Sequence, residues 1–310
     1  MEESQVIKIE GKDGEVLTIK YKTHLKTRVK LNLSKHTGES IELIVAGSLF
    51  AVLISVLQRV LLKWDGVILV TGDVGDGKST LAQLISAIWE WFFGRQQTMD
   101  CIVWRSENFT EQIEKEDNET KVILWDEAIQ GGTGRDGLTK QGQALKKAFV
   151  TKRYKRHLYL LLVDEIQEYN KKIISRTRAW IHCETYGLRR GYFKIYDDKT
   201  QIKRMYRKIK KYDLELEEVI KTEKPSFRGY QQDTTDIFYN EVEYKKKKAT
   251  ETSKEDKEGK SVHNISKFKV EIIQRLKDKE RSWKDISEVF GESENGVRMW
   301  FQRNKTNERT

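Results

Sequence analysis

The sequence predicts an α/β protein built on a parallel sheet, with a small antiparallel β unit before it and three helices after it. Short, wholly apolar segments alternate with helical ones between residues 67 and 163, which indicates a parallel sheet covered on both faces. Alternating apolar and polar residues precede this region, and helically spaced apolar residues follow it. We expect a β unit at 1–40, the α/β domain with a basic hairpin at 41–244, a flexible charged linker at 245–263 and a helical domain at 264–310.

The N-terminal part contains two patterns. Residues 5–34 alternate around the turn signal GKDG, which is typical of antiparallel strands. The run from Leu43 to Leu57 carries no charge, and Gly47, Ala51 and Ser55 follow a small-residue spacing used by packed membrane helices. As a helix this run would be about 22 Å long, shorter than the roughly 30 Å hydrocarbon core. We therefore expect a buried helix and favour it over a membrane anchor.

The α/β region is expected to contain four strands, two helices and a hairpin. The strands are VILVT at 67–71, CIVW at 101–104, VILW at 122–125 and LYLLLV at 158–163, and the helices run from Ser79 to about Phe93 and from about Leu138 to Arg153. The segment 189–211 reads as a hairpin that turns at DDK. Its ten Lys and Arg residues lie among Tyr192, Phe193, Tyr196 and Tyr206, which suits contact with a nucleic-acid backbone. A lysine-protected edge hairpin explains the pattern equally well.

Composition and charge indicate which partners, cysteine chemistry and cell compartment to expect. The formal net charge is +10 with 34% charged residues, which favours an anionic partner such as nucleic acid. Cys101 and Cys183 lie far apart without metal-binding spacing, so neither a disulfide framework nor a zinc site is indicated. The charged, alternating start MEESQVIKIE does not resemble a signal peptide. We expect a cytoplasmic protein.

A phosphate-binding motif follows the first of these strands. Residues 71–80, TGDVGDGKST, match GxxxxGK[ST] between an expected strand and an expected helix, the context that the motif requires. Glycines let the backbone N–H groups turn inward onto phosphates, and the helix dipole adds its positive end. Lys78 would neutralise the β and γ phosphates of ATP, Ser79 would ligate Mg²⁺, and Thr80 would contact the α-phosphate. The expected nucleotide-binding residues are Gly75, Asp76, Gly77, Lys78, Ser79 and Thr80.

Two expected strands end in adjacent carboxylates: VILW is followed by Asp126 and Glu127, and LYLLLV by Asp164 and Glu165. The chain resembles P-loop NTPases that have an extra strand and a catalytic glutamate, in which the acids follow the third strand and a sensor strand comes fourth. This resemblance implies that Asp126 holds Mg²⁺ and that Glu127 polarises the attacking water. Asp164 to Gln167 would then occupy the sensor position, unless the second pair is a plain surface feature.

Residues 65–210 are similar to a narrower family. The runs CIVWRSENFTEQIEKEDNETKVILWDEA and LLLVDEIQEYNKKIISRTRAWIHC resemble HerA/FtsK-related ATPases of viruses, plasmids and archaea, which pump or remodel DNA. This resemblance implies a homo-oligomer, with a ring as one form, and an arginine that reaches the phosphates from the same or a neighbouring chain. Arg135, Arg153 and Arg176 are candidates for that role, and Arg176 is favoured.

Residues 265–303 read as three short helices. The apolar anchors are Ile265, Phe268, Ile272 and Leu276 on the first, Ile286 and Phe290 on the second, which begins at Trp283, and Val297 and Trp300 on the third, with Gly291 at the turn. This spacing resembles a helix-turn-helix DNA-binding module. The third helix also looks like a homeodomain recognition helix, but Arg303 and Asn304 stand in the opposite order, so the adenine contact of that family is not carried over.

The third helix carries the donors that base edges and phosphates require, namely Asn295, Arg298, Gln302, Arg303 and Lys305. A protein-interaction module is the alternative for these three helices. A linker between an ATPase and a DNA reader favours a DNA-dependent ATPase or motor for packaging, transfer or remodelling of DNA in a mobile element or virus. An ATP-switched DNA-binding regulator of partition, initiation or transposition is the other hypothesis.

Overall fold

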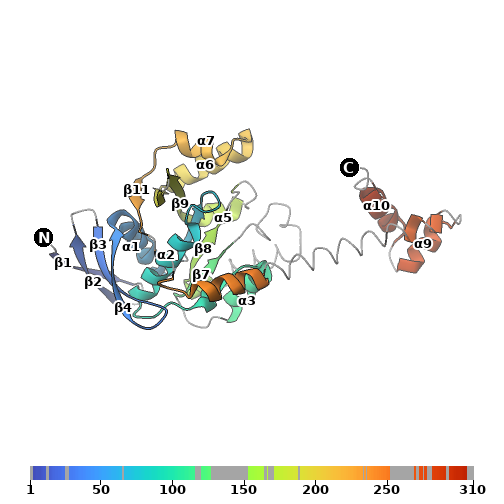
Figure 1. Ribbon diagram of the computed structural model, residues 1–310. Coiled ribbons are helices and arrows are strands. Elements are labelled where there is room, and N and C mark those ends of the chain that lie inside the picture. Colours follow the sequence, from blue (N-terminus) through green and yellow to red (C-terminus); the bar gives the residue numbers. More distant parts are fainter. Residues whose placement is uncertain are drawn as a thin grey trace. The chain divides into compact units, whose positions relative to one another are not determined.

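The chain divides into two compact units, Met1–Lys248 and Ala249–Thr310, seen in the computed structural model of Figure 1. Each unit is described by itself. The structure describes residues 3–11, 14–24, 28–64, 66–115, 120–126, 153–163, 166, 171–187, 189–232, 234, 236–251, 269, 272–274, 276–277, 281–290 and 293–305. The predicted helix from Leu138 to Arg153 lies almost wholly outside these residues.

The first unit begins with an antiparallel sheet of four strands in sequential order. They are β1 (Glu3–Glu10), β2 (Val16–His24), β3 (Arg28–Ser34) and β4 (Ser40–Ala46). Alternate residues such as Ile9, Ile19 and Leu31 are buried, as the alternation of apolar residues predicts. The β unit extends six residues beyond the boundary predicted at residue 40, because the start of the long apolar run, Leu43 to Ala46, pairs with β3 as the end of β4.

Helix α1 (Gly47–Leu61) follows β4 without a break. The helix predicted over 43–57 therefore begins four residues later, since Leu43 to Ala46 pair with β3. Leu49, Leu53 and Leu57 are fully buried, which agrees with the expected buried helix. No helix among the described residues is both long enough and apolar enough to cross a bilayer.

The central sheet has seven strands in the order β11-β10-β9-β5-β8-β7-β6. They are β5 (Gly66–Thr71), β6 (Ile102–Val103), β7 (Val122–Trp125), β8 (Leu158–Leu162), β9 (Thr177–Tyr186), β10 (Arg189–Tyr196) and β11 (Phe227–Tyr230). The strands from β6 to β9 are mutually parallel, whereas β10 and β11 are added antiparallel at one edge. All four predicted strands are present. The fourth of them along the chain, β8, lies between β5 and β7.

Helices cover both faces of this sheet. The first face packs on α1 and α2 (Lys78–Phe92), and the second on α3 (Ser106–Lys115), α5 (Lys171–Arg176), α6 (Lys199–Tyr212) and α7 (Leu216–Thr222). In β5, Ile68 and Val70 belong to the first apolar layer, and Val67 and Leu69 to the second. A strand buried on both faces must be apolar throughout, which is why VILV was readable as a parallel strand.

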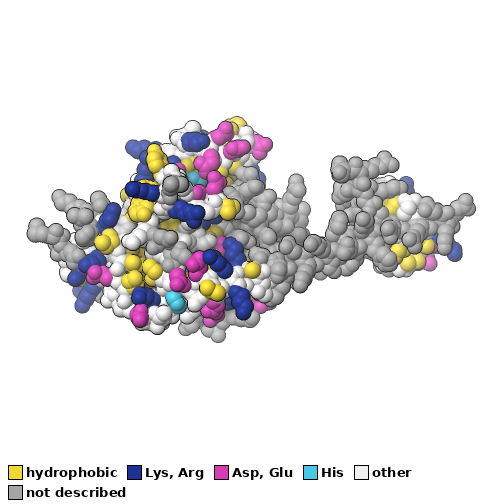
Figure 2. Space-filling model, in the orientation of Figure 1, with side chains coloured by type: hydrophobic (Ala, Val, Ile, Leu, Met, Phe, Trp, Pro, Cys, Tyr) yellow, Lys and Arg dark blue, Asp and Glu magenta, His cyan; other side chains and the backbone are white. Residues whose placement is uncertain are grey.

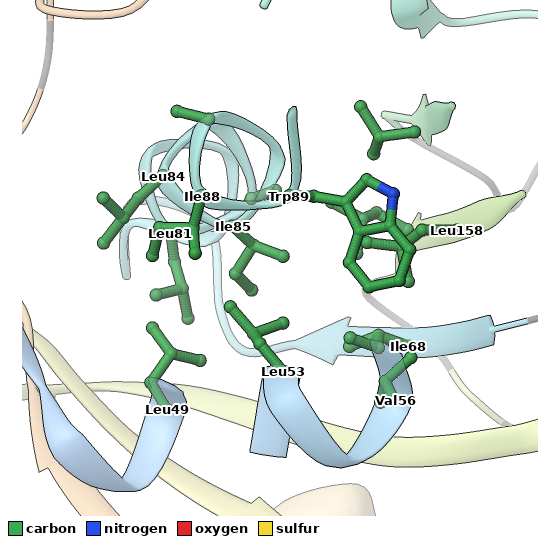
Figure 3. Close-up of a cluster of buried hydrophobic side chains, with 14 of the residues drawn as sticks. Leu49, Leu53, Val56, Ile68, Leu81, Leu84, Ile85, Ile88, Trp89 and Leu158 are labelled. Carbon is green, nitrogen blue, oxygen red and sulfur yellow. The ribbon is translucent and has the colours of Figure 1, made fainter. Parts of the chain in front are cut away.

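Helix α2 is anchored by a row of buried apolar side chains between Leu81 and Trp89, which Figure 3 labels. Ile85 and Ile88 point toward Leu53 of α1, and the indole N–H of Trp89 donates to the Thr120 carbonyl at 2.7 Å. A fully buried large aliphatic side chain contributes about 1.5–3 kcal/mol, so this row of contacts fixes the helix firmly. The beginning of α2, where the phosphate motif lies, is thereby held at one edge of the sheet.

The basic hairpin predicted at 189–211 has a different structure. Strand β10 pairs with β9 across a turn at Gly187, and DDK opens helix α6, where the Asp198 carboxylate accepts from the backbone N–H of Thr200 at 2.9 Å. A short carboxylate before a helix is a favoured N-cap, and this signal outweighs the turn pattern. Phe193, Tyr196 and Tyr206 are buried, so these aromatic residues belong to the core and are not a nucleic-acid surface.

The second unit contains α9 (Trp283–Phe290) and α10 (Glu294–Lys305), with helical residues also at 269, 272–274 and 276–277. Its apolar core consists of Ile273, Ile286, Val297 and Phe301. Ile286 and Val297 are buried as predicted, whereas on the first helix the buried residue is Ile273 and not its predicted neighbour Ile272. Ile265, Phe268, Gly291 and the side chain of Trp300 lie outside the described residues.

Residues 241–251 form one more helix, although the flexible linker was predicted to begin at 245. The Asp236 carboxylate accepts from the N–H of Glu241 at 2.9 Å, and the Asn240 side chain accepts from the N–H of Glu243 at 2.9 Å. These side chains satisfy the first N–H groups of the helix. The lysine-rich stretch therefore starts as an N-capped helix, here called the capping helix, which the structure describes as far as residue 251. The rest of the predicted linker is outside the described residues.

Candidate functional site

The phosphate motif forms a tight loop between β5 and α2. The φ angles of Gly72, Gly75 and Gly77 are 141°, 92° and 90°, in a region that residues other than glycine seldom adopt. A Cβ at Gly72 would lie 2.6 Å from the Cys183 carbonyl oxygen of β9, so glycine is also required there for close packing. The spacing of glycines in the sequence thus matches the positions where the backbone bends.

The loop is closed by its own side chains. The Lys78 ammonium donates to the carbonyl oxygens of Gly72 at 2.6 Å and Asp73 at 2.9 Å. The Asp76 carboxylate accepts from the Asp73 N–H at 2.8 Å and from the Thr185 hydroxyl at 2.6 Å. Asp76 therefore braces the loop, and its own backbone N–H donates to the Asp73 carbonyl at 3.2 Å, so its predicted role in nucleotide binding stays a prediction. The positive charge of Lys78 is held over the centre of the loop.

Asp126 lies at the carboxyl end of β7, on the loop side of the sheet. One oxygen of its buried carboxylate is 3.5 Å from the Ser79 hydroxyl. Mg²⁺ prefers oxygen ligands and commonly takes one or two from the protein beside substrate phosphates. Ser79 and Asp126 fit that donor set. Elsewhere the described residues contain no cluster of three or more His, Cys, Asp or Glu that could hold a metal ion.

A cavity of about 410 Å³ opens over the loop. Its walls include all the predicted nucleotide-binding residues except Asp76, together with Asp126 and Leu162 at the end of β8. The remaining wall contains residues that sequence reasoning did not select, namely Gln83, Arg190, Asp236, Tyr239, Glu241, Tyr244, Lys245 and Lys248. For Tyr244 and Lys248 the sequence signal was their spacing of four residues, but the lysine-rich composition of KKKK obscured it.

The predicted arginine, Arg176, does not lie near the loop of its own chain. It precedes Thr177, which pairs with Val67 at the start of β5, whereas the loop follows Thr71 at the end of that strand. Four residues of strand separate the two positions by about 13 Å. A same-chain phosphate role for Arg176 does not fit this position, and its role toward a neighbouring subunit stays a prediction. Arg135 and the side chain of Arg153 are outside the described residues.

Another arginine does face the loop. Strand β10 has a register shift between Arg189 and Tyr192, and Gly191 has φ of 96° at a point where a Cβ would overlap the Gln231 carbonyl. This bulge presents Arg190 both to the cavity over the loop and to a neighbouring cavity of about 420 Å³ beside Tyr192 and Tyr230. Bulges commonly redirect a side chain beside a functional site. The glycine within RRGY was the only sequence signal for it.

A buried chain of hydrogen bonds links the end of β5, which leads into the phosphate loop, to β9 and α7. The Trp180 indole N–H donates to the Thr71 hydroxyl at 2.7 Å, and this oxygen is 3.0 Å from Nδ1 of His182. The Nε2 atom of His182 lies 3.1 Å from the Glu217 carboxylate. Burial lowers the pKa of His182 to about 4, so the ring is neutral and the contact with Glu217 is a hydrogen bond at neutral pH.

The two buried histidines should make the fold sensitive to acid. Burial lowers the pKa of His157 to about 3 and that of His182 to about 4, whereas both rings protonate near pH 6.5 when unfolded. The unfolded chain therefore binds more protons below pH 6.5, and each histidine should lower the free energy of unfolding by about 2 kcal/mol at pH 5. Urea unfolding measured between pH 7 and pH 5 tests this.

The variant His157→Gln is the control for this experiment, since it should lose about half of the pH dependence. The range ends at pH 5 because Glu223, whose pKa is lowered to about 2 by hydrogen bonds from Arg204 and Lys208, still carries its charge in both states there. A free energy of unfolding that stays constant from pH 7 to pH 5 would contradict the prediction.

Of the remaining predicted site residues, some are described by the structure and others are not. Asn295, Arg298 and Gln302 are exposed along α10, at spacings that place them on one side of a helix. The side chains of Arg303 and Lys305 are outside the described residues, as are Glu127, Asp164 and Glu165. Their roles stay predictions.

Comparisons with known proteins give only distant similarity. No family model matches the chain, and no curated protein matches it. Among solved structures, the N-terminal domain of zonular occludens toxin from Neisseria meningitidis is 12% identical, with a TM-score of 0.36 over 57% of this chain and 100% of that domain. The genome packaging NTPase B204 from Sulfolobus turreted icosahedral virus 2, in complex with ATP-gammaS, is 14% identical, with a TM-score of 0.32 over 43% of this chain and 92% of that one. These likenesses are partial, and the site is argued from this chain alone.

Proposed function

We propose that this protein is a magnesium-dependent ATPase that acts on DNA, in packaging, transfer or remodelling. The observation that carries the proposal is the meeting of Lys78, Ser79 and Asp126 at one edge of a parallel sheet. A cationic loop at a helix N-terminus, opposite a buried carboxylate, has the chemistry that a metal–triphosphate complex requires.

Each residue has a distinct part in this proposal. The N–H groups at the start of α2 and the Lys78 ammonium bind the β and γ phosphates, and Arg190 adds a second positive charge from the other side of the cavity. Ser79 and Asp126 hold Mg²⁺, which when bound neutralises developing charge on the phosphates. Glu127 follows Asp126 directly and accepts the proton of the attacking water.

A basic groove supports DNA as the partner. On the face shown in Figure 2 basic and acidic side chains are interspersed, so the net charge does not form a single patch there. Helices α5 and α6, however, enclose a groove of about 490 Å³ lined by Lys171, Lys203, Arg207, Lys210 and Lys211. None of these five side chains has an acidic partner within the described part of the chain.

Two other cations of α6 provide the contrast. Arg204 and Lys208 are neutralised by the Glu223 carboxylate, at 2.6 and 2.8 Å. Among the described residues the groove cations have no such carboxylate partner, so they can contact phosphodiester oxygens, which dominate the affinity of proteins for DNA. The groove shares no lining residue with the two cavities beside the phosphate loop. DNA and nucleotide can therefore bind at the same time.

The experiment that tests the function measures ATP turnover with and without duplex DNA at two salt concentrations. We expect DNA to stimulate turnover, more strongly at the lower salt concentration because counterion release drives binding. In the double variant Lys203→Glu/Arg207→Glu, stimulation should fall about tenfold and the salt dependence of DNA binding should weaken by about two units of slope.

The matched control is Lys8→Glu/Lys20→Glu, which changes the net charge equally at exposed positions of β1 and β2. This control should keep its DNA stimulation. Loss of stimulation in both double variants would mean that net charge matters and the groove does not. A wild-type protein that hydrolyses ATP at one rate with or without any DNA would contradict the DNA part of the proposal.

A further inference from the structure

The carboxylate of Asp126 is already engaged on both sides. One oxygen faces the Ser79 hydroxyl at 3.5 Å. The other accepts a hydrogen bond from the Tyr244 hydroxyl and lies 3.3 Å from the Lys248 ammonium. Tyr244 and Lys248 are four residues apart and therefore lie on the same side of the capping helix. The carboxylate predicted to hold the metal is thus held by Tyr244, the last residue of the predicted α/β domain, and by Lys248, which was predicted to lie in the linker.

The segment that brings these groups to the site is fixed by buried contacts. The Tyr239 hydroxyl accepts from the Gln97 amide and lies 3.3 Å from the Cys101 sulfur, and the His36 N–H donates to the Ile237 carbonyl at 3.0 Å. The Tyr244 ring packs on Trp104 with centroids 5.8 Å apart. Because buried contacts hold this segment in place, the fold positions Lys248 beside Asp126, and the contact is not the chance approach of a surface lysine.

The lysine and a metal ion require the same oxygen. Asp126 has a single buried carboxylate, and a charge-assisted hydrogen bond to one of its oxygens uses the lone pairs that a cation would occupy. A divalent cation placed beside the Lys248 ammonium would also repel it at short range in a partly buried site. Lys248 and Mg²⁺ should therefore exclude one another at this oxygen.

We propose that Tyr244 and Lys248 are positioning residues that hold Asp126 in a metal-free arrangement and that compete with Mg²⁺ for it. This inference rests on the proposed function, because it assigns the metal to the Asp126 carboxylate. Binding of metal–nucleotide then releases Lys248 from Asp126, and with it the end of the capping helix. The last described turn of the capping helix opens the C-terminal unit in sequence, the part of the chain that the sequence predicts to read DNA.

The test titrates Mg²⁺ against binding of a fluorescent ATP analogue. The variant Lys248→Met should reach half-saturation at about tenfold less Mg²⁺ than wild type. Tyr244→Phe keeps the ring contacts and should shift the midpoint in the same direction. Lys248→Arg keeps the charge and should stay near the wild-type midpoint. Lys246→Met on the same helix, outside the cavity lining, is the matched control and should not shift it.

Analogue binding in EDTA separates this inference from other roles. If Lys248→Met binds the analogue several-fold more weakly without metal, Lys248 contacts phosphate and the competition is wrong. If the variant binds normally and its Mg²⁺ midpoint is unchanged, the inference fails while the proposed function stands. If the wild-type protein binds no analogue under any condition, both this inference and the proposed function are wrong. Thermal unfolding of each variant shows whether it folds. If Lys248→Met does not fold, the Mg²⁺ midpoints of Tyr244→Phe and Lys248→Arg still test the inference.

Discussion

Replacing Lys78 with alanine should lower kcat/KM for ATP at least about a hundredfold, the loss expected when a preorganised cationic donor at a developing charge is removed. The ammonium lies over the loop on the carbonyl oxygens of Gly72 and Asp73, where a phosphate would find it already oriented. The fold should survive, because the two lost hydrogen bonds contribute only about 1 kcal/mol each. Steady-state turnover and binding of a fluorescent ATP analogue measure the two effects separately.

The matched control is Lys224→Ala, which removes an exposed lysine that is outside the cavity lining. Lys78→Arg should be nearly as inactive as Lys78→Ala, since a planar guanidinium does not replace a compact ammonium inside a closed loop. Full hydrolysis by Lys78→Ala, with a purified protein free of contaminating ATPase, would overturn the phosphate-loop assignment and every role derived from it.

Much of the fold was readable because each signal was local. The strand β5, the glycines and the helix α2 lie together in 27 consecutive residues, Gly66 to Phe92, so the loop could be predicted from sequence alone. The errors arose where a local signal competed with another. Asp197 and Asp198 suggested a turn, but the second of them caps α6. Tyr196 and Tyr206 looked like stacking residues, although they pack in the core.

The site was predictable only on one side of its cavity. Lys78, Ser79 and Asp126 belong to motifs with fixed spacing, whereas Arg190, Tyr244 and Lys248 approach the loop from segments more than 60 residues further along the chain. Contacts of that kind depend on the packing of β10 and of the capping helix, and no spacing rule encodes them. The lysine run at 245–248 has a linker composition, and only tertiary contacts reveal that Lys248 lies on Asp126.

The strand order bears on the two acidic pairs. Strands β7 and β8 are parallel to β5, so both deliver their following residues to the edge of the sheet where the loop lies. Asp126 follows β7, and its carboxylate faces Ser79. Leu162 at the end of β8 lines the same cavity, one strand nearer to the loop. The first pair therefore has a described contact with the predicted metal ligand, and the second follows the strand expected to carry the sensor.

Replacing Glu127 with glutamine should leave ATP binding intact and slow hydrolysis by about 10²–10⁴-fold, because the amide keeps the shape of the side chain but cannot accept the proton of the attacking water. A kinetic scheme with unchanged binding and blocked chemistry leaves ATP trapped on the protein. Filter retention of radiolabelled ATP, followed by analysis of the bound nucleotide, distinguishes trapped ATP from ADP.

The comparison variant is Glu165→Gln, which makes the same chemical change after β8. A sensor residue orients the γ-phosphate or the water without taking the proton, so this variant should lose less activity than Glu127→Gln and should retain mainly ADP after turnover. If Glu165→Gln alone retains ATP, the acid that activates water follows β8. Asp126 would then bind Tyr244 and Lys248 and no metal ion. The acid after β8 would activate the water because β8, and not β7, lies directly beside β5, the strand that precedes the loop.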